Sequence, residues 1–217
     1  MSEVVERYRK LLTRGTDTDR IEFFSDAVFA IALTLLVLDI RLPVGTPAAE
    51  LGPALAALWP ELFAYVLTFA ILGLNWVSHH RKFKVIERYD AGLVWLNLAF
   101  LLFVALTPFP TSVLSEYGGQ LPAVLIYAFA VAMLGILQGV LWMYAWRRKL
   151  FAPTVDSTLY RYVLRNILVA PLVFLLSIPI AIFWEPLFAM FSWILLAPLS
   201  VIVARLPVRR RVSRSRG

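Results

Sequence analysis

Residues 20–39 read RIEFFSDAVFAIALTLLVLD, and this stretch decides the fold. Extended to Leu42, where Pro43 follows, it is long enough to cross about 30 Å of hydrocarbon as a helix. Asp26 lies between one and two turns inside that helix, where an unpaired carboxylate costs at least about 2.5–3.5 kcal/mol. We therefore expect a membrane helix in which Asp26 faces protein or water and has a partner.

The composition of the whole chain agrees with that stretch. Of the 217 residues, 60% are hydrophobic and 16% are charged, and the mean hydropathy is +0.76. Soluble domains carry about 45–50% apolar and about 25% charged residues, so this excess disfavours a soluble enzyme, a nucleic-acid-binding domain and a disordered chain. The absence of cysteine excludes a disulfide framework, a thiolate metal site and a cysteine nucleophile.

Five further apolar stretches follow the first, and each is long enough to span a bilayer with some tilt. We predict an all-α integral membrane protein with six transmembrane helices, at 20–42, 52–79, 91–113, 121–146, 160–183 and 186–206. The third span contains Thr107-Pro108-Phe109-Pro110, which must kink or end it. The chain then divides into an N-terminal segment at 1–19, one six-helix domain at 20–206 and a basic tail at 207–217.

Lys and Arg are distributed unequally between the two sides of the membrane. Twenty of these 21 residues lie on the side that holds both chain ends, and Arg41 alone lies on the other. The positive-inside rule therefore places both termini in the cytoplasm, which requires an even number of spans. The opposite side carries Asp39 and several glutamates, so the net charge of +7 reflects topology. Nucleic-acid binding by the Arg-rich tail is disfavoured, although such a tail also suits anionic lipid.

A helical wheel separates the aliphatic side chains of the first span from its acid. At about 100° per residue, Leu35 and Leu38 lie within about 40° of Ile31. Thr34 lies about 60° from Ile31, whereas Asp26 lies about 140° away. The result is an aliphatic stripe edged by a hydroxyl. Two ordinary alternatives stay open: the stripe faces lipid or another helix, and Thr34 bonds to its own helix backbone.

The second span carries a polar seam. Asn75, Ser78, His79 and Lys82 share one helical face by i+3 and i+4 spacing. The expected use of the seam is packing beside Asp26 at the cytoplasmic end of the bundle.

Short motifs in the first three spans are shared with a known family. They are Arg-x-x-x-Phe-Ser-Asp at Arg20, Phe24, Ser25 and Asp26, then Trp76 followed by His79-His80, and Pro-Phe-Pro-Thr at 108–111. With these motifs the chain resembles a prokaryotic member of the transmembrane protein 175 family, whose animal members are endolysosomal potassium channels. The animal members contain two six-helix units, whereas this chain has a single Arg-x-x-x-Phe-Ser-Asp.

The resemblance implies a homotetramer in which four copies of the first helix surround a central pore that lacks a pore loop. Bulky aliphatic layers form the constriction in that family, and they map here onto Ile31, Leu35 and Leu38. Thr34 matches a hydroxyl position that the family associates with potassium preference. The resemblance further implies a structural polar network that holds the first helix without touching the ion, made of Arg20, Phe24, Ser25, Asp26, Trp76 and His79.

The sequence as a whole then predicts a potassium-permeable cation channel that conducts passively. We expect the aliphatic layers to gate by dewetting, with modest selectivity, because the chain holds nothing like the Thr-Val-Gly-Tyr-Gly carbonyl filter. Asp39, at the outer mouth, is expected to raise the local cation concentration. We expect no enzymatic activity, no cofactor and no metal site, and a location in a bacterial inner membrane.

Other classes of function stay open. A proton-coupled secondary transporter or a proton-conducting channel would use Asp26 and His79 as titrating groups, although the chain lacks the internal repeats typical of transporters. His79 and His80 also suit a metal site or a proton relay. A membrane enzyme would need several acids or histidines at one depth, and Asp26 with the two histidines comes closest. A scaffold without transport activity is the last option.

Overall fold

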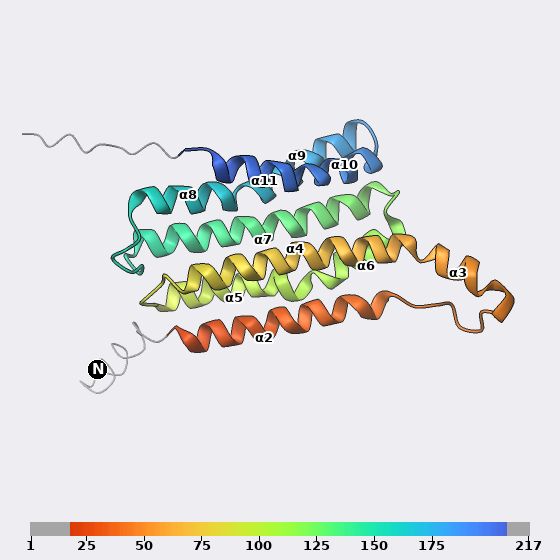
Figure 1. Ribbon diagram of the computed structural model, residues 1–217, viewed down its shortest axis with the longest axis horizontal. Coiled ribbons are helices and arrows are strands. Elements are labelled where there is room, and N and C mark those ends of the chain that lie inside the picture. The colour runs from red at the N-terminus through yellow and green to blue at the C-terminus, as the bar shows by residue number, and fades with distance from the viewer. Residues whose placement is uncertain (1–17, 208–217) are drawn as a thin grey trace, which may run out of the picture.

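The computed structural model describes residues 18–207, which form helices that run side by side in one bundle (Figure 1). The helices are α2 Asp19–Leu35, η1 Leu36–Asp39, η2 Ala48–Glu50, α3 Leu51–Ala57, α4 Trp59–Phe83, α5 Ala91–Leu106, α6 Pro108–Tyr117, α7 Leu121–Arg147, α8 Ser157–Ile167, α9 Val169–Phe183, α10 Pro186–Ser192, η3 Trp193–Leu195 and α11 Leu196–Arg205. The three η elements are short 3-10 helices.

Six stretches of the described chain are long and apolar enough to cross a membrane, and they confirm the six predicted spans. They are Asp19–Asp39, Trp59–Phe83, Ala91–Tyr117, Leu121–Arg147, Ser157–Phe183 and Pro186–Arg205. The second differs most from its prediction of 52–79, because Leu51–Ala57 is the separate helix α3 and the span itself continues to Phe83. Of the predicted terminal segments, 1–17 and 208–217 lie outside the described residues.

Proline explains where the spans are interrupted. A proline has no N–H to donate to the carbonyl four residues earlier, and its ring clashes with that carbonyl. Helix α5 ends at Leu106, four residues before Pro110, and α8 ends at Ile167, four residues before Pro171. The 3-10 helix η3 likewise contains Ile194, which lies four residues before Pro198. The interruption predicted for the third span is confirmed, and the fifth and sixth spans follow the same rule.

Helix α7 is the central helix of the bundle. In its apolar 18-residue window 61% of the residues are buried, whereas the corresponding share in the other five spans is 11–33%. It packs against α5 and α9, and in Figure 1 it lies between α4 with α5 and the group formed by α8, α9 and α11. Helix α9 approaches α7 closely at Gly135, where a Cβ atom would lie 2.5 Å from Cδ of Pro171. A side chain at this position would therefore push α9 away from α7.

Helix α2 lies at the edge of the bundle (Figure 1). It packs on α4 and α5 through one face, whose buried residues are Ser25, Phe29 and Ala32. The start of α2 and the end of α11 lie at the same end of the bundle, as an even number of spans requires (Figure 1). One face of α2 is thus fixed by the rest of the chain, and the opposite face is left open.

Asp90 fixes the position of α5. Its carboxylate accepts hydrogen bonds from Leu93 N at 2.9 Å, from the Tyr144 hydroxyl at 3.0 Å and from Arg148 Nε at 3.1 Å. Burial raises the pKa of Asp90, but these hydrogen bonds favour the carboxylate and together hold its pKa below the ordinary value. Asp90 therefore joins the first turn of α5 to the end of α7 and sets the level of Asn97 two turns later.

Candidate functional site

Ser25, near the head of α2, begins a hydrogen-bonded chain that crosses three helices. The Ser25 side chain is fully buried, and its hydroxyl donates to the carbonyl of Ile21 at 2.7 Å. Asn97 of α5 donates from Nδ2 to Ser25 Oγ at 3.0 Å. Oδ1 of the same amide lies 2.8 Å from Nε2 of His79 on α4. Asn97 thus ties α2 to both of its neighbours.

Asp26, the next residue of α2, is held from α4. Trp76 donates its Nε1–H to Asp26 Oδ1 at 2.7 Å, which supplies the partner that a carboxylate at this depth needs. The Trp76 indole stacks on the ring of His80, with 5.9 Å between the ring centroids. His80 Nδ1 pairs in turn with the carboxylate of Glu22, one turn before Asp26. A second polar contact between α2 and α4 therefore lies beside the first.

His79 is enclosed by aromatic rings. It is 1% exposed, and its ring centroid lies 5.3 Å from that of Phe100 and 4.4 Å from that of Phe83. Its Nε2 meets Asn97, and its Nδ1 has no hydrogen-bond partner among residues 18–207. His79 is therefore joined to the head of α2 through Asn97 and Ser25.

The structure brings together four of the six residues predicted for the polar network, Ser25, Asp26, Trp76 and His79. The other two lie outside it. Arg20 is exposed and forms no hydrogen bond or ion pair within the described part of the chain. Phe24 is 53% exposed. Neither side chain joins α2 to its neighbours within one subunit.

Three residues of the network were not predicted to belong to it, although His80 was quoted in the family motif, and each carries a signal. Asn97 is the one amide in α5, which reads AGLVWLNLAFLLFVAL, and a buried amide must be hydrogen-bonded. Glu22 lies four residues before Asp26, so the two carboxylates share one face of the helix. His80 lies four residues after Trp76, the spacing at which two rings on one helix stack.

Glu22, Asp26 and His80 are also residue types that hold metal ions. Their ligand atoms all lie within 4.8 Å of one another, and carboxylates with an imidazole suit a divalent cation such as zinc. Each of the three has a partner within the protein, because Asp26 accepts from Trp76 and Glu22 pairs with His80. The arrangement shown by the structure therefore joins α2 to α4.

The aliphatic stripe lies on the open side of α2 and η1. Its residues Ile31, Leu35 and Leu38 are 59%, 41% and 52% exposed. Thr34 is exposed as well, and its hydroxyl donates to the carbonyl of Ile31 at 2.9 Å. Asp39 is exposed at the end of η1. The stripe is thus an apolar surface on the edge of the bundle, opposite the face that the polar network holds.

Comparison with known proteins places this chain among ion channels. The family model of the endosomal/lysosomal potassium channel TMEM175 matches residues 20–108. The potassium channel B446_29190 of Streptomyces collinus is 40% identical over 146 residues, which are 65% of this chain and 71% of that protein. The endosomal/lysosomal proton channel TMEM175 of Danio rerio is 29% identical over 126 residues, which are 58% of this chain and 24% of that protein.

A solved structure agrees with the fold. The crystal structure of a lysosomal potassium-selective channel TMEM175 homolog from Chamaesiphon minutus superposes with a TM-score of 0.74. It is 29% identical in sequence, and the match covers 88% of this chain and 100% of that one. The family model begins at the Arg20 motif and ends in the third span, so it contains every residue of the polar network. This six-span membrane chain belongs to the TMEM175 family of ion channels.

Proposed function

We propose that four copies of the chain form a potassium-permeable channel in which α2 lines a central pore. The aliphatic stripe of Ile31, Leu35 and Leu38 forms the constriction, and conduction is passive. The channel domain spans 20–206, between the segments 1–19 and 207–217, in a bacterial inner membrane with both termini in the cytoplasm. The chain has no enzymatic role and needs no cofactor, and potassium is the permeant species.

One observation carries the proposal. The stripe is exposed on an edge helix, in a chain that belongs to a family of ion channels. Lipid tails would cover such a face equally well in an unrelated membrane protein, so exposure supports a pore only together with the family. The polar network adds a reason for the orientation, because Asn97 and Trp76 fix the rotation of α2 about its own axis.

The physics of permeation follows from the apolar character of the stripe. Moving a bare cation into hydrocarbon costs on the order of tens of kcal/mol, so an ion must keep hydration water as it passes. When the ring of aliphatic side chains narrows, water leaves and the barrier rises, which closes the pore. Potassium holds its water less tightly than sodium, so a narrow apolar ring favours potassium modestly.

The polar groups of α2 support this path in separate ways. The Thr34 hydroxyl donates its hydrogen bond to the carbonyl of Ile31. Its oxygen lone pairs therefore stay available to water or a cation at the edge of the stripe. Asp39, exposed at the outer end, raises the concentration of cations near the mouth. Ser25 and Asp26 are engaged by α5 and α4 and hold the helix.

Flux through reconstituted protein tests the proposal. Potassium-loaded vesicles that contain the purified protein should release potassium down its gradient, and Ile31→Asn should increase the leak several-fold because it wets the ring. Leu176→Asn is the matched control, since Leu176 is 64% exposed and belongs to α9, which α7 separates from α2 in the bundle (Figure 1). Equal flux for Ile31→Asn, Leu35→Asn and the wild-type protein would show that the pore assignment is wrong.

Proton conduction is the second candidate. Animal relatives carry the name of a proton channel, and this chain has titratable Asp26 and His79 in one hydrogen-bonded region. A pH-sensitive dye inside the same vesicles separates the two functions. Acidification without potassium movement would favour the proton channel over the potassium channel.

A further inference from the structure

A crevice that none of the channel machinery uses runs along the opposite flank of α4. It consists of two cavities of about 490 Å³ and about 450 Å³, which adjoin each other because both are lined by Leu74, Ser78, Asn166 and Ile167. Helix α7 forms its floor through Gly135, Gln138 and Trp142, α4 forms one wall, and α8, α9 and α11 form the other. Cavities of this size hold small organic ligands.

The two ends of the crevice differ in chemistry. The end near the last turn of α4 is lined by Arg81, Lys82, Tyr162 and Asn166. The deeper end lies among aliphatic side chains of α4, α9, η3 and α11, such as Leu67, Ile71 and Ile194. Among residues 18–207, no acidic side chain lines either cavity. The crevice thus matches a molecule with an anionic head and a hydrocarbon tail.

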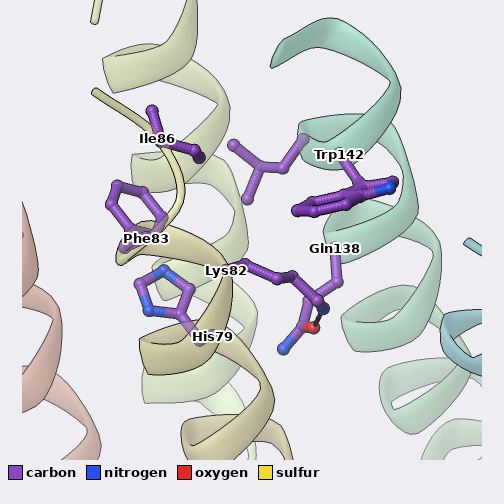
Figure 2. Close-up of a pocket in the computed structure, with 7 residues that line it drawn as sticks. His79, Lys82, Phe83, Ile86, Gln138 and Trp142 are labelled. Atoms are coloured by element: carbon purple, nitrogen blue, oxygen red, sulfur yellow. Dashed lines mark hydrogen bonds between the residues drawn. The ribbon is translucent and has the colours of Figure 1, made fainter. Parts of the chain in front are cut away.

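Lys82 supplies an independent reason for an anion. It is 8% exposed, and its ammonium donates to Oε1 of Gln138, whose amide in turn donates to the Asn75 carbonyl at 3.0 Å. Figure 2 shows the Lys82 side chain reaching from α4 toward Gln138 on α7, below Trp142. Within residues 18–207, Lys82 forms no ion pair with a carboxylate. A buried cation with neutral partners alone is costly, and an anion at the adjoining cavity would offset that cost.

The length of the crevice fits one leaflet. Eleven residues of helix separate Ser78 from Leu67, which corresponds to about 16 Å at about 1.5 Å per residue. Half of a hydrocarbon core of about 30 Å is about 15 Å. A chain that enters beside Ser78 would therefore end near the bilayer midplane.

We propose that this crevice binds an anionic glycerophospholipid of the leaflet at the Arg81 end. The phosphate lies between Arg81, Lys82 and Tyr162, and one acyl chain extends over α7 toward Leu67. Basic pockets between membrane helices hold acidic headgroups in this way. Bound lipid would fill the gap between α4 and the α8–α9–α11 group and brace the two parts against each other.

Lipid binding to the purified full-length assembly tests this site. Native mass spectrometry should show phosphatidylglycerol bound in preference to phosphatidylcholine. Arg81→Gln and Lys82→Met should each lower the affinity for phosphatidylglycerol about fivefold. This is the change in affinity expected when one basic residue near an anionic headgroup is lost. Lys84→Gln is the matched control, because Lys84 is exposed at the same helix end and lines neither cavity. Equal affinity for the wild-type protein and all three variants would overturn the proposal.

A second variant tests the acyl chain without touching the charge. Leu74 lines both cavities and is 66% exposed, so Leu74→Trp should fill the crevice and abolish the preference for phosphatidylglycerol while the assembly stays intact. Unchanged preference in Leu74→Trp would place the lipid elsewhere. Inorganic phosphate at equal concentration should not displace the lipid, and displacement would mean that the site binds an anion without its chains.

Single-cysteine labelling separates lipid from a second copy of the chain. Because the sequence has no cysteine, Leu74→Cys introduces a unique thiol. A lipid-soluble maleimide should label it in phosphatidylcholine vesicles, and phosphatidylglycerol should protect it. Oxidative cross-linking between two copies through this thiol would show that protein covers the crevice, which contradicts the lipid site.

Discussion

Asp26 shows how a charged residue is accommodated at membrane depth. Its Oδ1 accepts from Trp76, and the indole that donates is itself positioned by stacking on His80. The need for a partner follows from the cost of an unpaired carboxylate in a membrane helix, and the family resemblance placed Asp26 and Trp76 in one polar network. Asn97 did not follow from the motif, because no local rule states which helix faces Ser25.

Replacing either member of the Asp26–Trp76 pair should have unequal effects. Asp26→Asn keeps an oxygen that accepts the hydrogen bond from Trp76, but this acceptor is neutral where the carboxylate is charged. The free energy of unfolding should therefore fall by about 1 kcal/mol, and potassium flux should be retained. Trp76→Phe removes the donor and leaves the carboxylate unpaired, which should cost at least about 2.5–3.5 kcal/mol. Thermal unfolding in detergent and vesicle flux measure both. Loss of flux in a stable Asp26→Asn assembly would show that this carboxylate contacts the ion.

At the scale of helices, apolar length was enough to predict the six spans, and proline was enough to predict an interruption in the third. Helix α3 escaped prediction because Leu51–Ala57 is apolar and adjoins the second span, so hydropathy alone does not separate the two. The central place of α7 has a sequence signal that was not used: a helix that is apolar all round is buried.

The contact between α7 and α9 gives a matched pair of glycine substitutions. Gly135→Ala should destabilise the protein by about 1–3 kcal/mol, because its Cβ would lie 2.5 Å from the Pro171 ring. Gly73→Ala, on α4, meets nothing within 4 Å and should be neutral or stabilising by about 0.5–1 kcal/mol. Thermal unfolding in one detergent compares the two. Equal effects would mean that α7 and α9 lie farther apart than described.

The start of α5 should be sensitive to acid. The pKa of Asp90 is below its ordinary value of about 3.9, so its contribution to stability is present above that pH and is lost as the pH falls through the lowered pKa. Asp90→Asn should flatten this acid limb of the stability curve, and Asp90→Ala should in addition remove the helix cap at a cost of about 0.5–2 kcal/mol. Thermal unfolding between pH 3 and pH 7 measures both effects, and an unchanged acid limb in Asp90→Asn would contradict the assignment.

At the scale of the whole molecule, one subunit leaves the aliphatic stripe uncovered, and the wheel had separated this stripe from the acid on the same helix. What the wheel did not supply is the position of α2 at the edge of the bundle. That position follows from packing between distant spans, which no single stretch of sequence encodes.

Oligomeric state and cross-linking test the assembly. The purified protein should have four times the 24.6 kDa mass of one chain, since a monomer has no central pore. Ile31→Cys should form disulfide-linked pairs on oxidation because copies of α2 meet at the axis. Leu176→Cys should not, because it lies on α9, a helix that α7 separates from α2 (Figure 1). A monomer by light scattering, or cross-linking at position 176 alone, would contradict the arrangement.

The placement of proline has a mechanical consequence. The third, fifth and sixth spans are each jointed near their middle, whereas α7 runs through all 27 of its residues without a break. A span that is interrupted in the middle can bend at the interruption, so each half can tilt with its own leaflet. A stiff rod does the opposite and carries any tilt imposed at one membrane surface directly to the other. Tension in the bilayer would therefore reach α5 and α9 through α7, which packs against both and crosses the membrane as one unbroken helix.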